Sequence, residues 1–326
     1  MGKKIAFFEV EDWQRDFFKS KLKSDKLFFF PKKLGVSDLK KIKDVDVLCV
    51  FVKSQVSKEV VDKLSNLKLI VTMSTGYDHV DINYCKKKGI KVSNVPNYGM
   101  NTVAQHTFAL LLDLSKRITS SLEQAKRAYV DRHVTRGFDL QGKTLGIIGT
   151  GNIGQEVVRM AKGFSMKVIA YDVIKNMKAA KKSGYKYVSL DTLFKKSDVI
   201  TLHVPLFKST KHILNNAAFK KMKDGVVLIN TARGALIDTK ALIGSLKKGK
   251  LGGVGLDVLE DESIFSFKKL LGNRVSLDNR FLLKHPNVLI TNHNAFNTTE
   301  AIERIMSCTV SNIKGNFGKG KGVHLV

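Results

Sequence analysis

The sequence predicts an α/β protein built on parallel β-sheets, and three observations carry that prediction. Short apolar segments alternate along the chain with longer, lysine-bearing amphipathic segments, which is the pattern of strands joined by crossover helices. The apolar segments are nearly continuous, as in strands that are buried on both faces. The length of 326 residues is enough for about two domains.

The first part of the chain contains three predicted strands, at residues 4–10, 45–51 and 67–73, with polar helices between them. A long helix is expected at residues 101–115. It is apolar on most faces, so we expect it either in the core or at an interface. A polar stretch at residues 126–142 follows.

The second part contains six predicted strands, which are enough for a complete doubly wound sheet. They lie at residues 144–149, 167–172, 198–204, 225–230, 251–258 and 287–291. A last helix is expected at residues 298–316.

The net charge of +27 raises the question of a nucleic-acid partner. The lysines recur in short clusters on most predicted helices rather than in one stripe, and no aromatic residues are interleaved with them as a base-stacking surface requires. We therefore expect a charged solvated surface that attracts anions modestly, and no nucleic-acid partner.

The composition favours a cytoplasmic protein. The apolar start of the chain is interrupted by Glu9 and Glu11, which argues against a signal peptide, and no apolar run is long enough to cross a membrane. The three cysteines, Cys49, Cys85 and Cys308, form no metal-binding pattern and are expected to be reduced. We predict no metal site.

A glycine-rich turn predicts a dinucleotide site. Gly149, Gly151 and Gly154 form a GxGxxG motif between a predicted strand and a predicted helix. The first glycine permits the tight turn, the second lets the backbone approach a diphosphate, and the third lets helix and strand pack closely. The helix N-terminus then offers amide N–H groups to the diphosphate.

An acidic residue completes this motif. Asp172 ends the next predicted strand, where a carboxylate accepts hydrogen bonds from ribose hydroxyls and repels a 2′-phosphate. The sequence therefore predicts NAD rather than NADP as the cofactor.

Three further polar residues follow predicted strands, at the edge where ligands bind in open α/β sheets. Arg233 stands in "NTARGALID", Glu262 in "GLDVLEDESIF" and His293 in "ITNHNAF". Arginine stays charged and can pair with a carboxylate, and histidine is the side chain that most readily transfers protons near neutral pH. Glu260, Asp261 and Glu262 are adjacent acids, and the residues alone do not say which one acts.

The chain resembles the NAD-dependent D-2-hydroxyacid dehydrogenase family, and within it the D-lactate dehydrogenase branch. The motifs that carry the resemblance span nearly the whole chain: "STGYDHVD", "NVPNYGMNTVAQHT", "GIIGTGNIG", "HVPL", "NTARGALID", "GLDVLEDE" and "NHNAFNT". Asn292 departs from the pattern, because a proline is common before the catalytic histidine of the family.

The resemblance implies three catalytic residues. Arg233 would bind the carboxylate and carbonyl of a 2-keto acid, and His293 would donate the proton during reduction and accept it during oxidation. Glu262 would hydrogen-bond His293, orient it and favour the imidazolium; the family spacing selects it over its two acidic neighbours.

The resemblance also implies binding residues. Thr75 and Gly76 would offer backbone N–H groups to the substrate carboxylate, and Tyr98 would line the substrate pocket. Besides Asp172 and the three glycines, the cofactor would be bound by Asn152, Ile153, Val204, Pro205, Thr210, Thr231, Ala232 and Asp257. Thr231 and Asp257 would hold the nicotinamide carboxamide.

The implied architecture is two Rossmann-like or flavodoxin-like domains with a cleft between them. Residues 1–100 and 298–326 would form the substrate domain, and residues 101–297 the NAD domain. The expected protein is a homodimer that reduces a 2-keto acid, with pyruvate as the first choice because of Tyr98, Ile264 and Phe265.

Two alternatives remain open at this stage. One is a different 2-keto acid, such as a branched-chain acid, hydroxypyruvate or glyoxylate. The other is an NADH-sensing protein that resembles the transcriptional corepressors of the same family.

Overall fold

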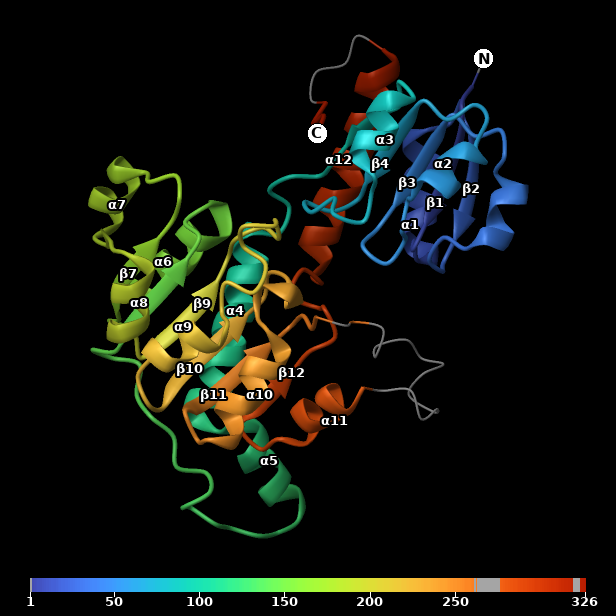
Figure 1. Cartoon of the computed structure of the whole chain (residues 1–326). Helices are drawn as coiled ribbons and strands as arrows, with labels where there is room; N and C mark the ends of the chain where they lie inside the picture. The colour runs from blue at the N-terminus through green and yellow to red at the C-terminus, as the bar shows by residue number, and fades with distance from the viewer. Residues whose placement is uncertain (1, 261, 263–275, 319–322) are drawn as a thin grey trace. The chain divides into compact units, whose positions relative to one another are not determined.

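The computed structural model describes residues 2–260, 262, 276–318 and 323–326, and the chain divides into two compact units (Figure 1). The first unit contains the residues up to Tyr98 together with those from Thr298 onward, and the second contains Gly99–Asn297. Each unit is built on one parallel sheet, of five and seven strands respectively. The predicted α/β fold class is therefore confirmed.

The five-stranded sheet has the order β2-β1-β3-β4-β5, and every neighbouring pair is parallel. Its strands are β1 (Lys4–Phe8), β2 (Lys26–Phe30), β3 (Val47–Val50), β4 (Leu69–Thr72) and β5 (Lys91–Ser93). The three central strands match the predicted segments. The two edge strands, β2 and β5, were not predicted.

Both faces of this sheet are covered. The helices of the unit are α1 (Asp12–Lys21), η1 (Val36–Lys41), α2 (Lys58–Asp62), α3 (Ile82–Lys87) and α12 (Thr299–Phe317). Phe7 of β1 packs on Phe18 of α1 with ring centroids 4.4 Å apart, whereas Phe8 belongs to the core cluster on the other face. The C-terminal helix α12 packs against α1 and β4, so the end of the chain completes the N-terminal unit.

The seven-stranded sheet is also parallel throughout and has the order β12-β11-β10-β9-β6-β7-β8. Its strands are β6 (Thr144–Ile148), β7 (Lys167–Tyr171), β8 (Lys186–Tyr187), β9 (Val199–Leu202), β10 (Val226–Asn230), β11 (Leu251–Leu256) and β12 (Val288–Ile290). All six predicted strands are present. The order reverses between β6 and β9, which makes the sheet doubly wound.

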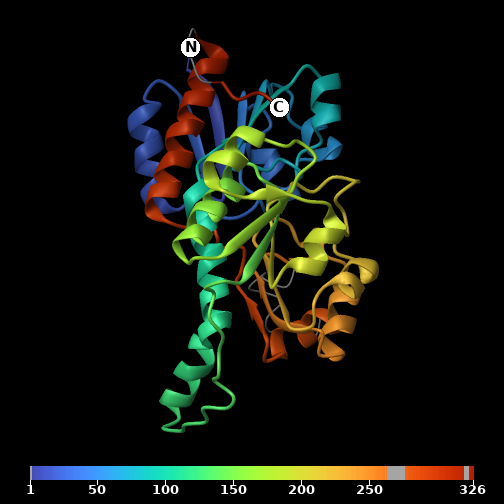
Figure 2. The ribbon, with the colours of Figure 1, turned by 90° about the vertical axis from the view of Figure 1, so that its left-hand side faces the viewer.

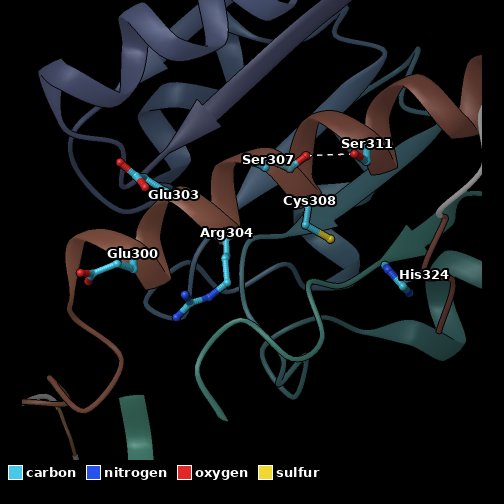
Figure 3. Close-up of a pocket in the computed structure, with 7 residues that line it drawn as sticks. All are labelled: Glu300, Glu303, Arg304, Ser307, Cys308, Ser311 and His324. Atoms are coloured by element: carbon cyan, nitrogen blue, oxygen red, sulfur yellow. Dashed lines mark hydrogen bonds between the residues drawn. The ribbon is translucent and has the colours of Figure 1, made fainter. Parts of the chain in front are cut away.

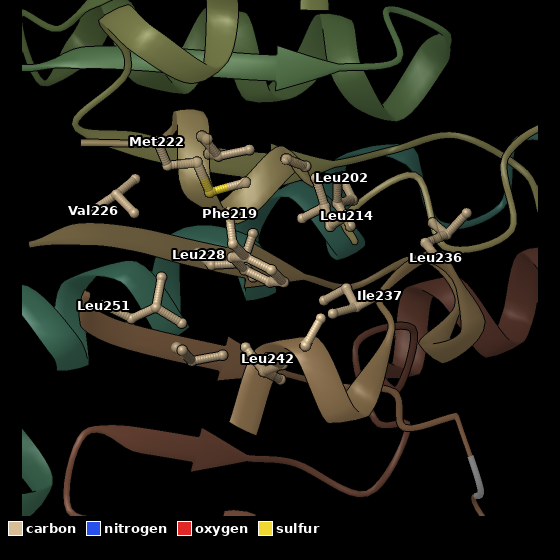
Figure 4. Packing of buried hydrophobic residues seen from close by; sticks show 14 of the residues in the cluster. Leu202, Leu214, Phe219, Met222, Val226, Leu228, Leu236, Ile237, Leu242 and Leu251 are labelled. Atoms are coloured by element: carbon tan, nitrogen blue, oxygen red, sulfur yellow. The ribbon is translucent and has the colours of Figure 1, made fainter. Parts of the chain in front are cut away.

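Helices cover both faces of this second sheet. They are α4 (Met100–Lys116), α5 (Ile118–Lys126), α6 (Asn152–Gly163), α7 (Met177–Ser183), α8 (Leu190–Lys196), α9 (Asn216–Lys221), η2 (Gly234–Leu236), α10 (Thr239–Lys247) and α11 (Leu277–Lys284). In β10, Val226 and Leu228 pack into one core cluster, and Val227 and Ile229 pack into the other. Figure 4 shows the first cluster, between the sheet and helices α9 and α10. This alternation explains why the strand is apolar at each position from Val226 to Ile229.

Helix α4 is part of the core of the second unit. Phe108, Leu110 and Leu111 are buried in the cluster that also contains residues of β6, β7 and α6. Of the two predicted roles for its apolar residues, core packing is the one found for these three.

Helix α5 differs from α4, because none of its residues is buried. Figure 2 shows it extending beyond the sheet of its own unit, followed by an irregular segment that returns toward β6. The sequence did not predict this helix.

No helix in the described part of the chain combines the length and the apolar character that a membrane span requires.

The junction between β6 and α6 depends on its glycines. Gly149 has φ +98°, a left-handed conformation that favours glycine. A Cβ atom on Gly154 would lie 2.1 Å from the carbonyl oxygen of Gly149, so the helix can pack this closely on the turn only because residue 154 has no side chain.

We therefore expect Gly154→Ala to destabilise the second unit by about 1–3 kcal/mol, because the added methyl group must push backbone atoms apart. Gly163→Ala is the matched control, since it lies in the same helix and a Cβ there would meet nothing within 4 Å. Urea unfolding followed by circular dichroism measures both. Equal stability of the two variants would contradict the inferred packing.

Candidate active site

The predicted cofactor and catalytic residues of the second unit follow neighbouring strands of one parallel sheet. With Asp172 included, the strands number six, namely β7, β6, β9, β10, β11 and β12, and the carboxyl ends of parallel strands meet at one edge. Ligands of doubly wound sheets bind at this edge, next to the point where the strand order reverses. The fold therefore gathers residues that are up to 145 positions apart, from Gly149 to Asn294 (294 − 149 = 145).

The glycine turn fits a dinucleotide. Gly151 is the N-cap of α6, and the space where its Cβ would stand is open to at least 4 Å, so a diphosphate can approach the backbone. Asn152 and Ile153 form the first turn of α6, where backbone N–H groups lack helical partners. The shape and the polarity of the turn are both those that a diphosphate requires.

Asp172 lies directly beside this turn. Its carboxylate accepts hydrogen bonds from the Thr150 amide (2.6 Å) and hydroxyl (3.0 Å), and from the amide of Ile174 (3.0 Å). These contacts fix a negative charge at the end of β7. The carboxylate is therefore held next to the glycine turn.

The segment after β9 packs on the other side of the glycine turn. A Cβ on Gly149 would lie 2.8 Å from Val204 and 2.5 Å from the His203 carbonyl oxygen. Thr210 closes the following loop, because its hydroxyl donates to the Pro205 carbonyl (2.7 Å) and accepts from the Phe207 amide (2.8 Å). Val204, Pro205 and Thr210 therefore form one ordered loop.

His203 is not available as an acid or base. Burial of its imidazole lowers the pKa to about 3, so the ring is neutral at physiological pH. Its Nε2 atom lies 2.8 Å from the hydroxyl oxygen of Thr201.

The turn that carries Arg233 is fixed by Asn230. The Asn230 side chain accepts from the amide of Ala232 (3.0 Å) and donates to the carbonyl of Arg233 (2.9 Å). A Cβ on Gly234 would lie 1.9 Å from the Leu259 carbonyl carbon, so this turn packs tightly on the segment that leads to Glu262. Two segments predicted to be catalytic are thereby in direct contact.

Asp257 is fully buried after β11 and acts as an acceptor for the loop that follows β12. It accepts from the Thr291 hydroxyl (2.5 Å) and from the amides of Asn294 (2.8 Å) and Ala295 (2.9 Å). Burial alone would raise the pKa of this carboxyl, but hydrogen bonds from His106, Thr291 and the two amides outweigh burial and lower it. Asp257 is therefore an anion whose carboxylate accepts hydrogen bonds largely from this loop.

His293 lies in the loop that Asp257 holds. Its Nδ1 atom is 2.8 Å from Glu262 Oε2, and its side chain is 17% exposed. Its φ of +58° is a left-handed conformation that costs a residue other than glycine about 1–3 kcal/mol. The amide of His293 donates to the Asp257 carbonyl (2.8 Å), which helps to hold this conformation.

Glu260 and Glu262 have different hydrogen-bond partners in the structure. Glu260 lies 2.7 Å from His212 Nε2 and accepts from the Thr239 hydroxyl at 2.7 Å. Burial would raise the pKa of Glu260, but the hydrogen bonds from Thr239 and His212 lower it. Glu262 is thus the acid beside His293, as the family spacing predicts. Asp261, Ile264 and Phe265 lie outside the described residues.

The predicted substrate residues Thr75, Gly76 and Tyr98 belong to the first unit, where they follow the neighbouring strands β4 and β5. The Thr75 hydroxyl donates to the Val95 carbonyl (3.0 Å), and the Thr75 carbonyl accepts from the Asn94 side chain (2.9 Å). The loops after the two strands are therefore joined to each other.

Helix α12 also contacts this region of the first unit. Arg304 Nε donates to the Tyr98 carbonyl at 2.7 Å, which fixes the backbone of the predicted pocket residue. Arg304 also lines a cavity of about 710 Å³ along α12, together with Cys308 and His324 (Figure 3). None of the catalytic, substrate-binding or cofactor-binding residues predicted from the sequence lines this cavity.

Sequence reasoning missed several residues that support the site. Asn230 shapes the arginine turn, and His106 and Thr107 of α4 contact Thr291 and Thr231 at 3.0 and 2.9 Å. The signal available was the "NTVAQHT" motif, in which His106 and Thr107 directly precede the apolar run "FALLL" of the same helix.

Comparison with known proteins agrees with this geometry. Residues 108–295 match the family model described as D-isomer specific 2-hydroxyacid dehydrogenase, NAD binding domain. A D-lactate dehydrogenase of Escherichia coli is 37% identical over 98% of each chain. A hydroxypyruvate reductase of Thermotoga maritima is 41% identical over 82% of this chain and 83% of its own.

A solved structure extends the similarity to the whole fold. The D-lactate dehydrogenase of Aquifex aeolicus, complexed with NAD and lactic acid, superimposes with a TM-score of 0.90 at 39% identity. The alignment covers 99% of this chain and 98% of the other. The chain therefore belongs to the D-isomer-specific 2-hydroxyacid dehydrogenase family and is an NAD-dependent oxidoreductase that reduces 2-keto acids.

Proposed function

We propose that the chain reduces pyruvate to D-lactate, and that Arg233, Glu262 and His293 are its catalytic residues. The observation that carries the catalytic part is the 2.8 Å contact between His293 and Glu262, at the same sheet edge as the glycine turn. The choice of pyruvate is supported by Tyr98 and by the similarity to D-lactate dehydrogenases over nearly the full chain.

The domain roles are part of this proposal. The unit that contains Gly99–Asn297 binds NAD, since it encloses the segment that matches the NAD-binding family model. The other unit binds the acid through Thr75, Gly76 and Tyr98, whose loops follow adjacent strands. The backbone N–H groups of Thr75 and Gly76 are donors, which suit a carboxylate.

The cofactor is held by the groups around the glycine turn. Gly149, Gly151, Gly154, Asn152 and Ile153 receive the diphosphate, and Asp172 receives the adenosine ribose. Val204, Pro205 and Thr210 flank the adenosine side. Thr231, Ala232 and Asp257 lie at the nicotinamide end. When bound, the reduced nicotinamide supplies the hydride.

The protein side chains supply the rest of the chemistry. The Arg233 guanidinium pairs with the substrate carboxylate and polarises the carbonyl. His293 donates a proton from Nε2 to the developing alkoxide, since its Nδ1 faces Glu262. The Glu262 carboxylate accepts a hydrogen bond from Nδ1 of His293 and fixes the orientation of the ring.

We expect purified protein to consume NADH fastest with pyruvate among a panel that also contains hydroxypyruvate, glyoxylate and branched-chain 2-keto acids. His293→Ala should lower kcat by about 10²–10⁴-fold, which is the usual contribution of acid–base catalysis. His324→Ala is the matched control, because this histidine is exposed and is none of the predicted site residues.

A different best acid would correct the substrate and leave the mechanism in place. Full activity of His293→Ala would refute the catalytic assignment. Tight NADH binding without turnover of any acid would instead favour the sensing protein considered from the sequence.

We expect a higher kcat/KM with NADH than with NADPH, because the Asp172 carboxylate repels a 2′-phosphate. Asp172→Asn keeps an acceptor for the Thr150 amide but removes the charge, so the ratio of the two kcat/KM values should fall. Asp191→Asn, an exposed acid on α8, serves as the control. An unchanged ratio in Asp172→Asn would refute the assigned ribose contact.

We also propose a cytoplasmic homodimer in which α5 and the segment after it bind a second copy. The three cysteines are all free thiols, which suits a reducing compartment. The proposed interface contains exposed apolar side chains at Leu122 (55%), Tyr129 (56%) and Val130 (75%). Such clusters mark protein interfaces.

Light scattering should give the wild type twice the chain mass of 36.3 kDa. Leu122→Asp should lower the mass toward that of one chain, because it places a charge in an apolar contact. Val36→Asp, at an exposed apolar position in the first unit, should leave the mass unchanged. A dimer that persists in Leu122→Asp would place the interface elsewhere.

A further inference from the structure

His106 of α4 contacts the loop that carries His293, although it is 187 residues away in the sequence (293 − 106 = 187). Its Nε2 atom lies 3.0 Å from the Thr291 hydroxyl oxygen and 3.4 Å from Asp257 Oδ1. The His106 side chain is 20% exposed, and Asp257 is almost wholly buried. The contact thus lies in the interior of the second unit.

The direction of these hydrogen bonds follows from the chemistry of the three groups. The Asp257 carboxylate can only accept, so the Thr291 hydroxyl donates its proton to it across 2.5 Å. The Thr291 oxygen is then left to accept from His106. The proton of a neutral His106 ring must therefore reside on Nε2. The series of hydrogen bonds runs from His106 through Thr291 to Asp257.

This series of hydrogen bonds ends at the Asp257 carboxylate, which fixes the loop of His293. Asp257 accepts from the amides of Asn294 and Ala295, the two residues that follow His293. Its own carbonyl accepts from the His293 amide. A change in the position of the Asp257 carboxylate must therefore shift the backbone on both sides of His293.

The next residue of α4 makes a parallel contact. The Thr107 hydroxyl donates to the Val103 carbonyl (2.9 Å), so the Thr231 hydroxyl, 2.9 Å away, must donate to Thr107. Two consecutive side chains of α4 therefore reach the ends of β10 and β12. An apolar helix that served only to fill the core would present neither group.

We propose that His106 is a positioning residue for His293, acting through Thr291 and Asp257. It holds the hydroxyl of Thr291 in the one orientation that completes the set of donors around Asp257. The catalytic importance of the loop rests on the proposed role of His293, whereas the structural coupling between His106 and His293 does not.

Four variants test the proposal. His106→Leu removes the donor, and His106→Gln places an amide N–H near the position of Nε2. Thr291→Val removes the hydroxyl with little change of shape. Gln105→Leu, at the exposed neighbouring position of α4, is the matched control. Thermal unfolding shows whether each variant remains folded.

The first readout is steady-state reduction of the best 2-keto acid. His106→Leu and Thr291→Val should each lower kcat by roughly 10–100-fold with little change in KM, because a misplaced catalytic group slows the reaction more than binding. The double variant should be no slower than the worse single variant, since both remove one chain of contacts. His106→Gln and Gln105→Leu should stay near the wild-type kcat.

The second readout does not need turnover. The Cε1–H resonance of His293, assigned by its loss in His293→Ala, should shift in His106→Leu and Thr291→Val and stay in place in His106→Gln. If the wild type reduces no acid, the proposed function fails and this resonance alone decides the coupling. An unshifted resonance in both variants, or equal damage by leucine and glutamine at position 106, would overturn the proposal.

Discussion

The carboxylate of Asp257 is buried at the end of β11, and the loop that carries His293 is built on it. Burial raises the pKa of this carboxyl, but hydrogen bonds from His106, from the Thr291 hydroxyl and from two amides outweigh burial and keep it ionised. Apart from His106, these donors belong to the segment after β12. The need to satisfy one buried charge therefore fixes the left-handed backbone of His293 and places its imidazole beside Glu262. The hydrogen bonds between this loop and Asp257 offset the free-energy cost of that backbone conformation.

The parallel sheet makes this arrangement possible. Loops after adjacent strands are separated by a whole crossover helix in sequence but meet at one edge, so the glycine turn, the arginine turn and the histidine loop lie along the same edge of the sheet. Close packing then joins the first two of these to the segments that follow neighbouring strands. Gly149 lies against His203 and Val204, and Gly234 lies against Leu259. Small residues at these points let the backbones approach, and the functional side chains stand beside them.

Much of the fold could be predicted, since strands buried on both faces are continuous apolar runs. All six strands of the second unit that the sequence predicts are present. The unpredicted strands, β2, β5 and β8, are edge strands, and β5 and β8 are only three and two residues long. Helix α5 was missed because it buries no residue within its own chain. The contact of Glu262 with His293 agrees with the family spacing, whereas the engagement of Glu260 by His212 needed the three-dimensional structure. No periodicity could have revealed the contacts of His106, because they join segments that are far apart in sequence.

We propose that this chain acts on the D-isomer of a 2-hydroxy acid, with hydride moving to NAD and a proton to His293. Oxidation of separate D-lactate and L-lactate samples, followed by NADH absorbance, distinguishes the two isomers. We expect NADH formation with D-lactate and none above background with L-lactate. Turnover of L-lactate at a comparable rate would refute the proposed stereospecificity.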